Sequence, residues 1–167
     1  MSLFFWLNCG NNKQNELTRA ACGGKIGDVK KYLKDDAVDV NGTDEYGWTA
    51  LHCACCNGHD DIAELLLNHG ADIEAVTNDN YTPLMVSCRG GQLSTTKILL
   101  GRGSRVNAVD KSGDTPLHLA GYFASQECVQ ALIAKGANKR IKNKVGKRPL
   151  EPIKSLDRML EEQGVVL

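Results

Sequence analysis

Apolar and polar positions along this chain follow a pattern that returns every 33 residues. A four-residue motif recurs at this spacing as Thr49-Ala50-Leu51-His52, Thr82-Pro83-Leu84-Met85, Thr115-Pro116-Leu117-His118 and, in altered form, Arg148-Pro149-Leu150-Glu151. The same interval separates the glycines Gly70, Gly103 and Gly136. Agreement between independent positions on one period indicates tandem structural repeats.

Each repeat predicts two short helices followed by a polar loop. Thr followed by Pro suits a helix N-cap and the first helical position. Leu51, Ala54 and Cys55 then lie at spacings that place them on one helical face. Gly58 and Gly91 are predicted to end first helices, and Gly70, Gly103 and Gly136 to follow second helices with a left-handed backbone. A unit of this length cannot bury its own apolar face, so the pattern predicts an all-α repeat solenoid of stacked units.

These motifs resemble the ankyrin repeat family, whose signature T-P-L-H-x-A has a 33-residue period. Residues 115–120 match it in full, and residues 49–54 depart from it only at Ala50. The resemblance covers roughly residues 14–163 and implies helix-turn-helix-loop units stacked into a curved array. We predict an N-terminal apolar extension (1–13), an N-capping repeat 1 (14–43), repeats 2, 3 and 4 (44–76, 77–109 and 110–142) and a partial C-capping repeat 5 (143–167). The atypical end repeats indicate a complete array.

Composition restricts the cellular compartment. The chain has seven cysteines, an odd number, without the spacing of a disulfide framework. We therefore expect a reducing compartment, the cytosol or the nucleus. No apolar run approaches the roughly 18 residues of a membrane span. The apolar segment Leu3–Leu7 lacks the flanks of a signal peptide.

The best candidate for metal or catalytic chemistry is the stretch from His52 to His59. It contains a C-x-x-C pair, Cys53 and Cys56, and two histidines, which are zinc ligand types. The repeat argues against this, because Cys22, Cys55 and Cys88 recur at the 33-residue period, where the family has a small buried residue. The resemblance likewise implies structural hydrogen bonds for His52 and His118. With no nucleotide-binding glycine motif present, we predict no metal, no cofactor and no enzymatic activity.

Partners of ankyrin repeats are usually gripped by loop tips and first helices, which line a concave face. The resemblance carries this face by register onto Tyr46, Trp48, Tyr81, Arg89, Lys111, Asp114, Tyr122, Phe123, Lys144 and Lys147. Five of these residues are aromatic, and exposed Tyr, Trp and Arg dominate the energetics of protein interfaces. Alternatively, some of these aromatic residues cover the ends of neighbouring helices, and Trp48 or Tyr81 lies flat along its own loop.

Charge is strongly segregated, although the net charge is zero. Residues 16–80 hold thirteen acids and five bases, whereas residues 81–150 hold twelve bases and three acids. Residues 139–148 alone hold six bases and no acid. This polarity favours a protein partner with an acidic segment. Binding of nucleic acid or anionic phospholipid through residues 139–148 is the alternative, but the patch is a single loop outside any known nucleic-acid fold. We predict a monomeric adaptor, scaffold or inhibitory subunit.

Two local features remain open at this point. Leu33 and Asp39-Val40-Asn41 resemble the pattern used for asparagine hydroxylation in ankyrin repeats, but Asn at position 41 is also a common structural choice. Leu3–Leu7 is expected to pack on repeat 1, with a membrane-interface anchor or a hook for a partner as alternatives.

Overall fold

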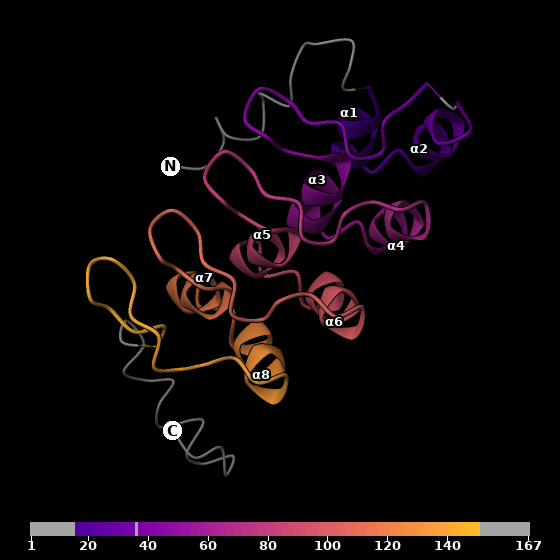
Figure 1. Ribbon diagram of the computed structural model, residues 1–167. Coiled ribbons are helices and arrows are strands. Elements are labelled where there is room, and N and C mark those ends of the chain that lie inside the picture. Colours follow the sequence, from indigo (N-terminus) through magenta and orange to yellow (C-terminus); the bar gives the residue numbers. More distant parts are fainter. Residues whose placement is uncertain (1–15, 36, 151–167) are drawn as a thin grey trace.

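Paired helices joined by loops make up the part of the chain that the structure describes, residues 16–35 and 37–150 of a computed structural model (Figure 1). In these two ranges there are eight helices and no strand, which confirms the predicted all-α repeat solenoid. They are α1 (Glu16–Cys22), α2 (Ile26–Tyr32), α3 (Ala50–Asn57), α4 (Asp60–Asn68), α5 (Pro83–Arg89), α6 (Leu93–Gly101), α7 (Pro116–Tyr122) and α8 (Gln126–Ala134). None of them is long and apolar enough to cross a membrane. The predicted extension 1–13 and residues 151–167 of repeat 5 lie outside the described ranges.

The recurring motif starts helices α3, α5 and α7 as expected. Thr49, Thr82 and Thr115 are their N-caps, and each threonine side chain accepts a hydrogen bond from the backbone N–H three residues later. Pro83 and Pro116 are the first residues of α5 and α7. At the other end of the helix pairs, Gly70, Gly103 and Gly136 have φ values of 85°, 91° and 85°, which confirms the predicted left-handed backbone.

Helices of the same kind stack into two rows. The first helices α1, α3, α5 and α7 pack on one another, and the second helices α2, α4, α6 and α8 form a row beside them (Figure 1). Leucines at equivalent positions of both rows are completely buried: Leu51, Leu84 and Leu117 in the first, Leu66, Leu99 and Leu132 in the second. Each contributes roughly 1.5–3 kcal/mol relative to an exposed leucine. One core therefore runs through the array without a break between repeats.

The loops before α3, α5 and α7 and after α8 project from the same side of the first-helix row (Figure 1). In each loop one side chain accepts hydrogen bonds from two backbone N–H groups of the same loop. These organising residues are Asp44, Thr77, Asp110 and Asn143. The loops and the ends of the first helices together make a surface that we call the inner face. It comprises Trp48, Tyr81, Asp114 and Lys147 from the loops, and Cys56, Arg89, Tyr122 and Phe123 from the helix ends.

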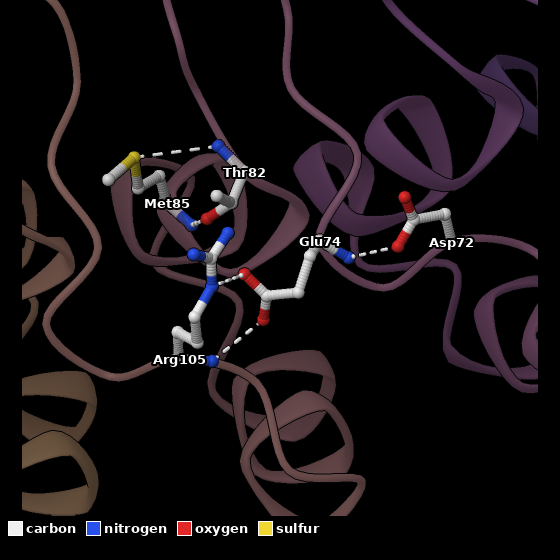
Figure 2. Close-up of polar contacts among 5 residues, drawn as sticks. All are labelled: Asp72, Glu74, Thr82, Met85 and Arg105. Carbon is white, nitrogen blue, oxygen red and sulfur yellow. Dashed lines mark hydrogen bonds and ion pairs between the residues drawn. The ribbon is translucent and has the colours of Figure 1, made fainter.

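A second set of bonds joins neighbouring repeats beyond the second helices. Asn41 accepts a hydrogen bond from the N–H of Asp72 at 2.7 Å and donates to the carbonyl of Gly70 at 3.3 Å. Two repeats later, Asn107 makes the same two bonds with the carbonyl of Gly136 and the N–H of Asn138. Asn41 therefore has a structural role, because its side chain joins repeat 1 to repeat 2. Glu74 stands at the equivalent position between them, and its two carboxylate oxygens accept from the backbone N and the Nε of Arg105, both at 2.7 Å (Figure 2).

Candidate functional site

Arg89, the last residue of α5, lies between two aromatic rings on the inner face. Its Cζ is 5.8 Å from the ring centroid of Tyr81 and 5.6 Å from that of Phe123, within the range of cation–π attraction. Tyr81 precedes α5, whereas Phe123 follows α7 in the next repeat. Burial raises the pKa of Tyr81, so its hydroxyl stays protonated. Three of the predicted binding residues thus form one cluster across two repeats, which we call the stacked cluster.

Tyr122 and Asp114 form a hydrogen-bonded group beside it. The Tyr122 hydroxyl donates to Asp114 Oδ1 at 3.0 Å, and Asn143 Nδ2 donates to the same oxygen at 2.8 Å. Asn143 Nδ2 also lies 2.9 Å from the Tyr122 hydroxyl. Burial, followed by the hydrogen bond to Asp114, raises the pKa of Tyr122 to about 12. The phenol therefore remains a donor at neutral pH and holds the Asp114 carboxylate against the loop.

Asn143 is the residue of this group that the sequence did not single out. It is the organising residue of its loop, and its Oδ1 accepts from the N–H groups of Val145 and Lys147. The organising residues of the other loops accept the same two bonds, but their side chains carry no amide NH₂ group that could also donate: Asp44, Thr77 and Asp110. The available signal was therefore an Asn in a register of Asp and Thr, but the sequence does not show that its amide faces Asp114 and Tyr122.

The other five predicted residues are distributed along the loops. Trp48 is half-buried, and its ring centroid is 5.8 Å from that of His52, so its ring lies against the first turn of α3. Tyr46 is 47% exposed at the tip of the same loop. Lys111, Lys144 and Lys147 are exposed. Phe123 of the stacked cluster is 52% exposed, and Tyr122 of the hydrogen-bonded group is 37% exposed. Tyr81 is half-buried, because its ring packs against the core as well as against Arg89.

The histidines of the recurring motif are structural. In the buried His52, Nε2 donates to the carbonyl of Tyr81 at 2.9 Å, while Nδ1 accepts from the N–H of Thr49 at 3.2 Å. His118 repeats both contacts with Lys147 and Thr115. Burial lowers the pKa of His52 to about 4, so its ring is neutral at physiological pH. These bonds are the ones the family resemblance implied.

Two cysteines of the stretch from His52 to His59, Cys55 and Cys56, lack the environment of reactive thiols, and so do Cys88 and Cys128. Burial raises the pKa of the Cys55, Cys56, Cys88 and Cys128 thiols, which keeps them protonated and poorly nucleophilic. The ring of His59 is hydrogen-bonded to the carbonyl of Cys22. Within residues 16–35 and 37–150, no three His, Cys, Asp or Glu side chains are placed to hold a metal ion.

Comparison with known proteins agrees with this architecture. A family model described as ankyrin repeats (3 copies) matches residues 2–77 and 73–143. A search of curated proteins found no match. Ankyrin repeats are generally non-catalytic and serve as protein–protein interaction modules. With its capped helix pairs and its 33-residue period, the chain belongs to the ankyrin repeat family.

Proposed function

We propose that this chain is a non-catalytic adaptor, scaffold or regulatory subunit that binds another protein on its inner face. The stacked cluster of Tyr81, Arg89 and Phe123 is the observation that supports this most directly. Aromatic and arginine side chains supply most of the energy at protein interfaces. Because these three side chains hold one another in place, they lose little conformational freedom when a partner binds.

The charge of this region supports a partner with an acidic segment. Arg89 and the exposed Lys111, Lys144 and Lys147 lie along repeats 3 to 5. The acids near Tyr81 are Asp79, Asp110 and Asp114, and the last two already accept hydrogen bonds. Exposed charges steer association and are screened by salt. Raising the salt from about 50 to about 500 mM is expected to lower the association rate about tenfold or more. An unchanged rate and affinity would contradict the electrostatic part of the proposal.

The state of the cysteines supports the reducing compartment that we propose, cytosol or nucleus. Cys22, Cys53, Cys55, Cys56, Cys88 and Cys128 all carry free thiols. Proteins that pass through oxidising compartments usually pair their cysteines. The raised thiol pKa values also support a non-catalytic role, because a nucleophilic cysteine needs a stabilised thiolate.

Affinity capture from a native lysate, read by mass spectrometry, tests the proposal. Wild type is compared with the double variant Arg89→Ala, Phe123→Ala, and with Lys97→Ala, which removes one charge from an exposed position on α6. Thermal melts first establish that all three proteins fold. We expect a partner that wild type and Lys97→Ala retain and that the double variant loses. Equal capture by all three would show that the partner binds elsewhere.

Residues 139–148 support a second candidate function, binding of nucleic acid or anionic phospholipid. Five of the six bases in this segment are exposed: Arg140, Lys142, Lys144, Lys147 and Arg148. Direct binding to a generic RNA and to phosphatidylserine vesicles separates this function from the first. A protein-binding module gives weak binding that salt abolishes, whereas a true nucleic-acid or lipid site saturates at micromolar concentration near 150 mM salt.

A further inference from the structure

The tips of successive loops form a row along one edge of the molecule (Figure 1). Two adjacent residues mark each tip at equivalent positions: Glu45 and Tyr46, Asn78 and Asp79, Lys111 and Ser112, Lys144 and Val145. All eight residues are exposed. We call this set the tip row. It shares Lys111 and Lys144 with the bases proposed to attract an acidic partner, but it contains no residue of the stacked cluster.

Backbone hydrogen bonds fix the spacing of the tip row. The N–H of Asn78 donates to the carbonyl of Tyr46 at 2.9 Å, and that of Lys111 to the carbonyl of Asp79 at 3.0 Å. The N–H of Lys144 donates to the carbonyl of Ser112 at 2.9 Å. Since the same bond recurs between each pair of neighbours, the tips keep an even spacing and present a preformed surface.

The charges of the tip row are complementary to those of a second tip row that runs in the opposite direction. Glu45 and Asp79 make the first two tips acidic, while Lys111 and Lys144 make the last two basic. The two outermost tips also carry exposed apolar side chains, Tyr46 at 47% and Val145 at 76% exposure. A second copy in the opposite direction therefore presents a base to each acid, and Val145 to Tyr46.

We propose that the tip row binds the tip row of a second copy of this chain in antiparallel fashion. The two-fold axis passes between Asp79 and Lys111, so that Glu45 faces Lys144 of the second copy and Asp79 faces Lys111 of the second copy. A two-fold interface uses each contact twice, which gives four opposite-charge pairs. The zero net charge of the chain leaves no long-range repulsion between copies. This goes beyond the proposed function and differs from the monomer predicted from the sequence.

Sedimentation velocity of the purified full chain, from about 5 to about 500 μM, measures this dimer. Exposed ion pairs are individually weak and screened by salt, so we expect a weak dimer that loses at least tenfold in affinity between about 50 and about 500 mM salt. Lys144→Glu places two acids opposite each other at both ends of the interface. Glu45→Lys places two bases there. Each change is expected to weaken the dimer tenfold or more.

The combination of both changes in one chain decides the arrangement. Glu45→Lys with Lys144→Glu restores opposite charges only if residues 45 and 144 of different copies meet, so we expect it to recover wild-type affinity. Lys97→Glu, the same charge change on α6, is the control and should leave the dimer intact. A wild type that stays monomeric at low salt, or a double variant as weak as the single ones, overturns the proposal. The Arg89→Ala, Phe123→Ala variant should still dimerise, so the two proposals fail separately.

Discussion

His52 shows how one side chain of the recurring motif serves two repeats. Its Nδ1 accepts a hydrogen bond from the backbone N–H of Thr49, the N-cap residue of α3. Its Nε2 donates to the carbonyl of Tyr81 in the next repeat. The Nδ1 bond requires the neutral ring, because a protonated Nδ1 would face the N–H of Thr49, whereas Nε2 can donate to the carbonyl of Tyr81 in either protonation state. Met85 stands at the equivalent position of repeat 3, where its sulfur lies 3.5 Å from the backbone N of Thr82 (Figure 2). A thioether has no proton to donate to the following loop, so this position of repeat 3 lacks the second bond.

The shifted pKa of His52 predicts acid sensitivity. In the folded state burial holds the pKa at about 4, below its ordinary value of 6.5. The unfolded chain therefore binds the proton first, and the contribution of His52 is complete above about pH 6.5 and lost as the pH falls towards 4. Between pH 7.5 and 5 we expect it to account for about 2 kcal/mol of lost unfolding free energy. Urea unfolding at both pH values measures this loss.

The matched variant for this prediction is His52→Met, since repeat 3 already accommodates a methionine there. The variant is expected to be less stable at pH 7.5 but to lose about 2 kcal/mol less than wild type on acidification. Comparing the two slopes cancels the other titrating groups. Parallel slopes would mean that His52 is not the group responsible.

At the scale of the helix pair, repeat 3 differs from its neighbours by a polar contact inside its core. Ser87 in α5 and Thr96 in α6 are completely buried, and their hydroxyl oxygens are 3.0 Å apart. The Ser87 hydroxyl donates to the carbonyl of Leu84 at 2.9 Å, which leaves Thr96 to donate to Ser87. The equivalent positions of repeats 2 and 4 hold Ala54 and Ala63, and Ala120 and Val129.

This contact predicts strong coupling between the two positions. Ser87→Ala alone leaves the buried Thr96 hydroxyl with only the weakly accepting sulfurs of Cys88 and Cys128, at 4.0 and 3.8 Å, and is expected to cost about 1–2 kcal/mol. Adding Thr96→Val removes the orphaned hydroxyl, so the double variant should recover most of that loss. Chemical unfolding of wild type, both single variants and the double variant gives the coupling energy. Simple addition of the two single effects would contradict the assigned bond.

The Glu74–Arg105 contact makes a second prediction at this scale. Glu74→Ala removes the acceptor of the Arg105 backbone N–H. The expected cost is only about 1 kcal/mol, because this exposed N–H can donate to water instead. Glu74→Asn installs the side chain that repeats 1 and 3 use at this position, Asn41 and Asn107, and should recover most of the loss. Thermal unfolding measures both variants. An Asn variant as unstable as the Ala variant would mean that the three positions are not equivalent.

The helices and their ends were predictable because their determinants are local. Thr82 and Pro83 specify the start of α5, and Gly103 specifies the turn after α6, without reference to distant residues. The stacked cluster was only partly predictable. Register placed Tyr81, Arg89 and Phe123 on one face, but their contact depends on the distance between repeats. Gly90 occupies the position in repeat 3 that Phe123 occupies in repeat 4. A Cβ at Gly90 would lie 2.6 Å from the carbonyl oxygen of Cys56 in the preceding repeat, so the spacing between repeats leaves no room for a side chain there.

At the scale of the whole molecule, the repeats contact mainly their neighbours, so one framework carries surfaces of different character. The second helices supply a row that completes the core. The inner face carries the stacked cluster and the group around Tyr122, and the tip row carries acids at one end and bases at the other. Substitutions at these surface positions can therefore change binding with little effect on the fold.

The central claim is that the inner face binds the partner, and hydrogen exchange of the free chain against its complex with the captured partner tests it most directly. Amides that a partner covers exchange more slowly. The account predicts slower exchange in residues 78–82, 89–91, 111–115 and 121–124, which hold the loops and helix ends around the stacked cluster. Protection confined to the second helices α4, α6 and α8, with these four segments unchanged, would contradict it.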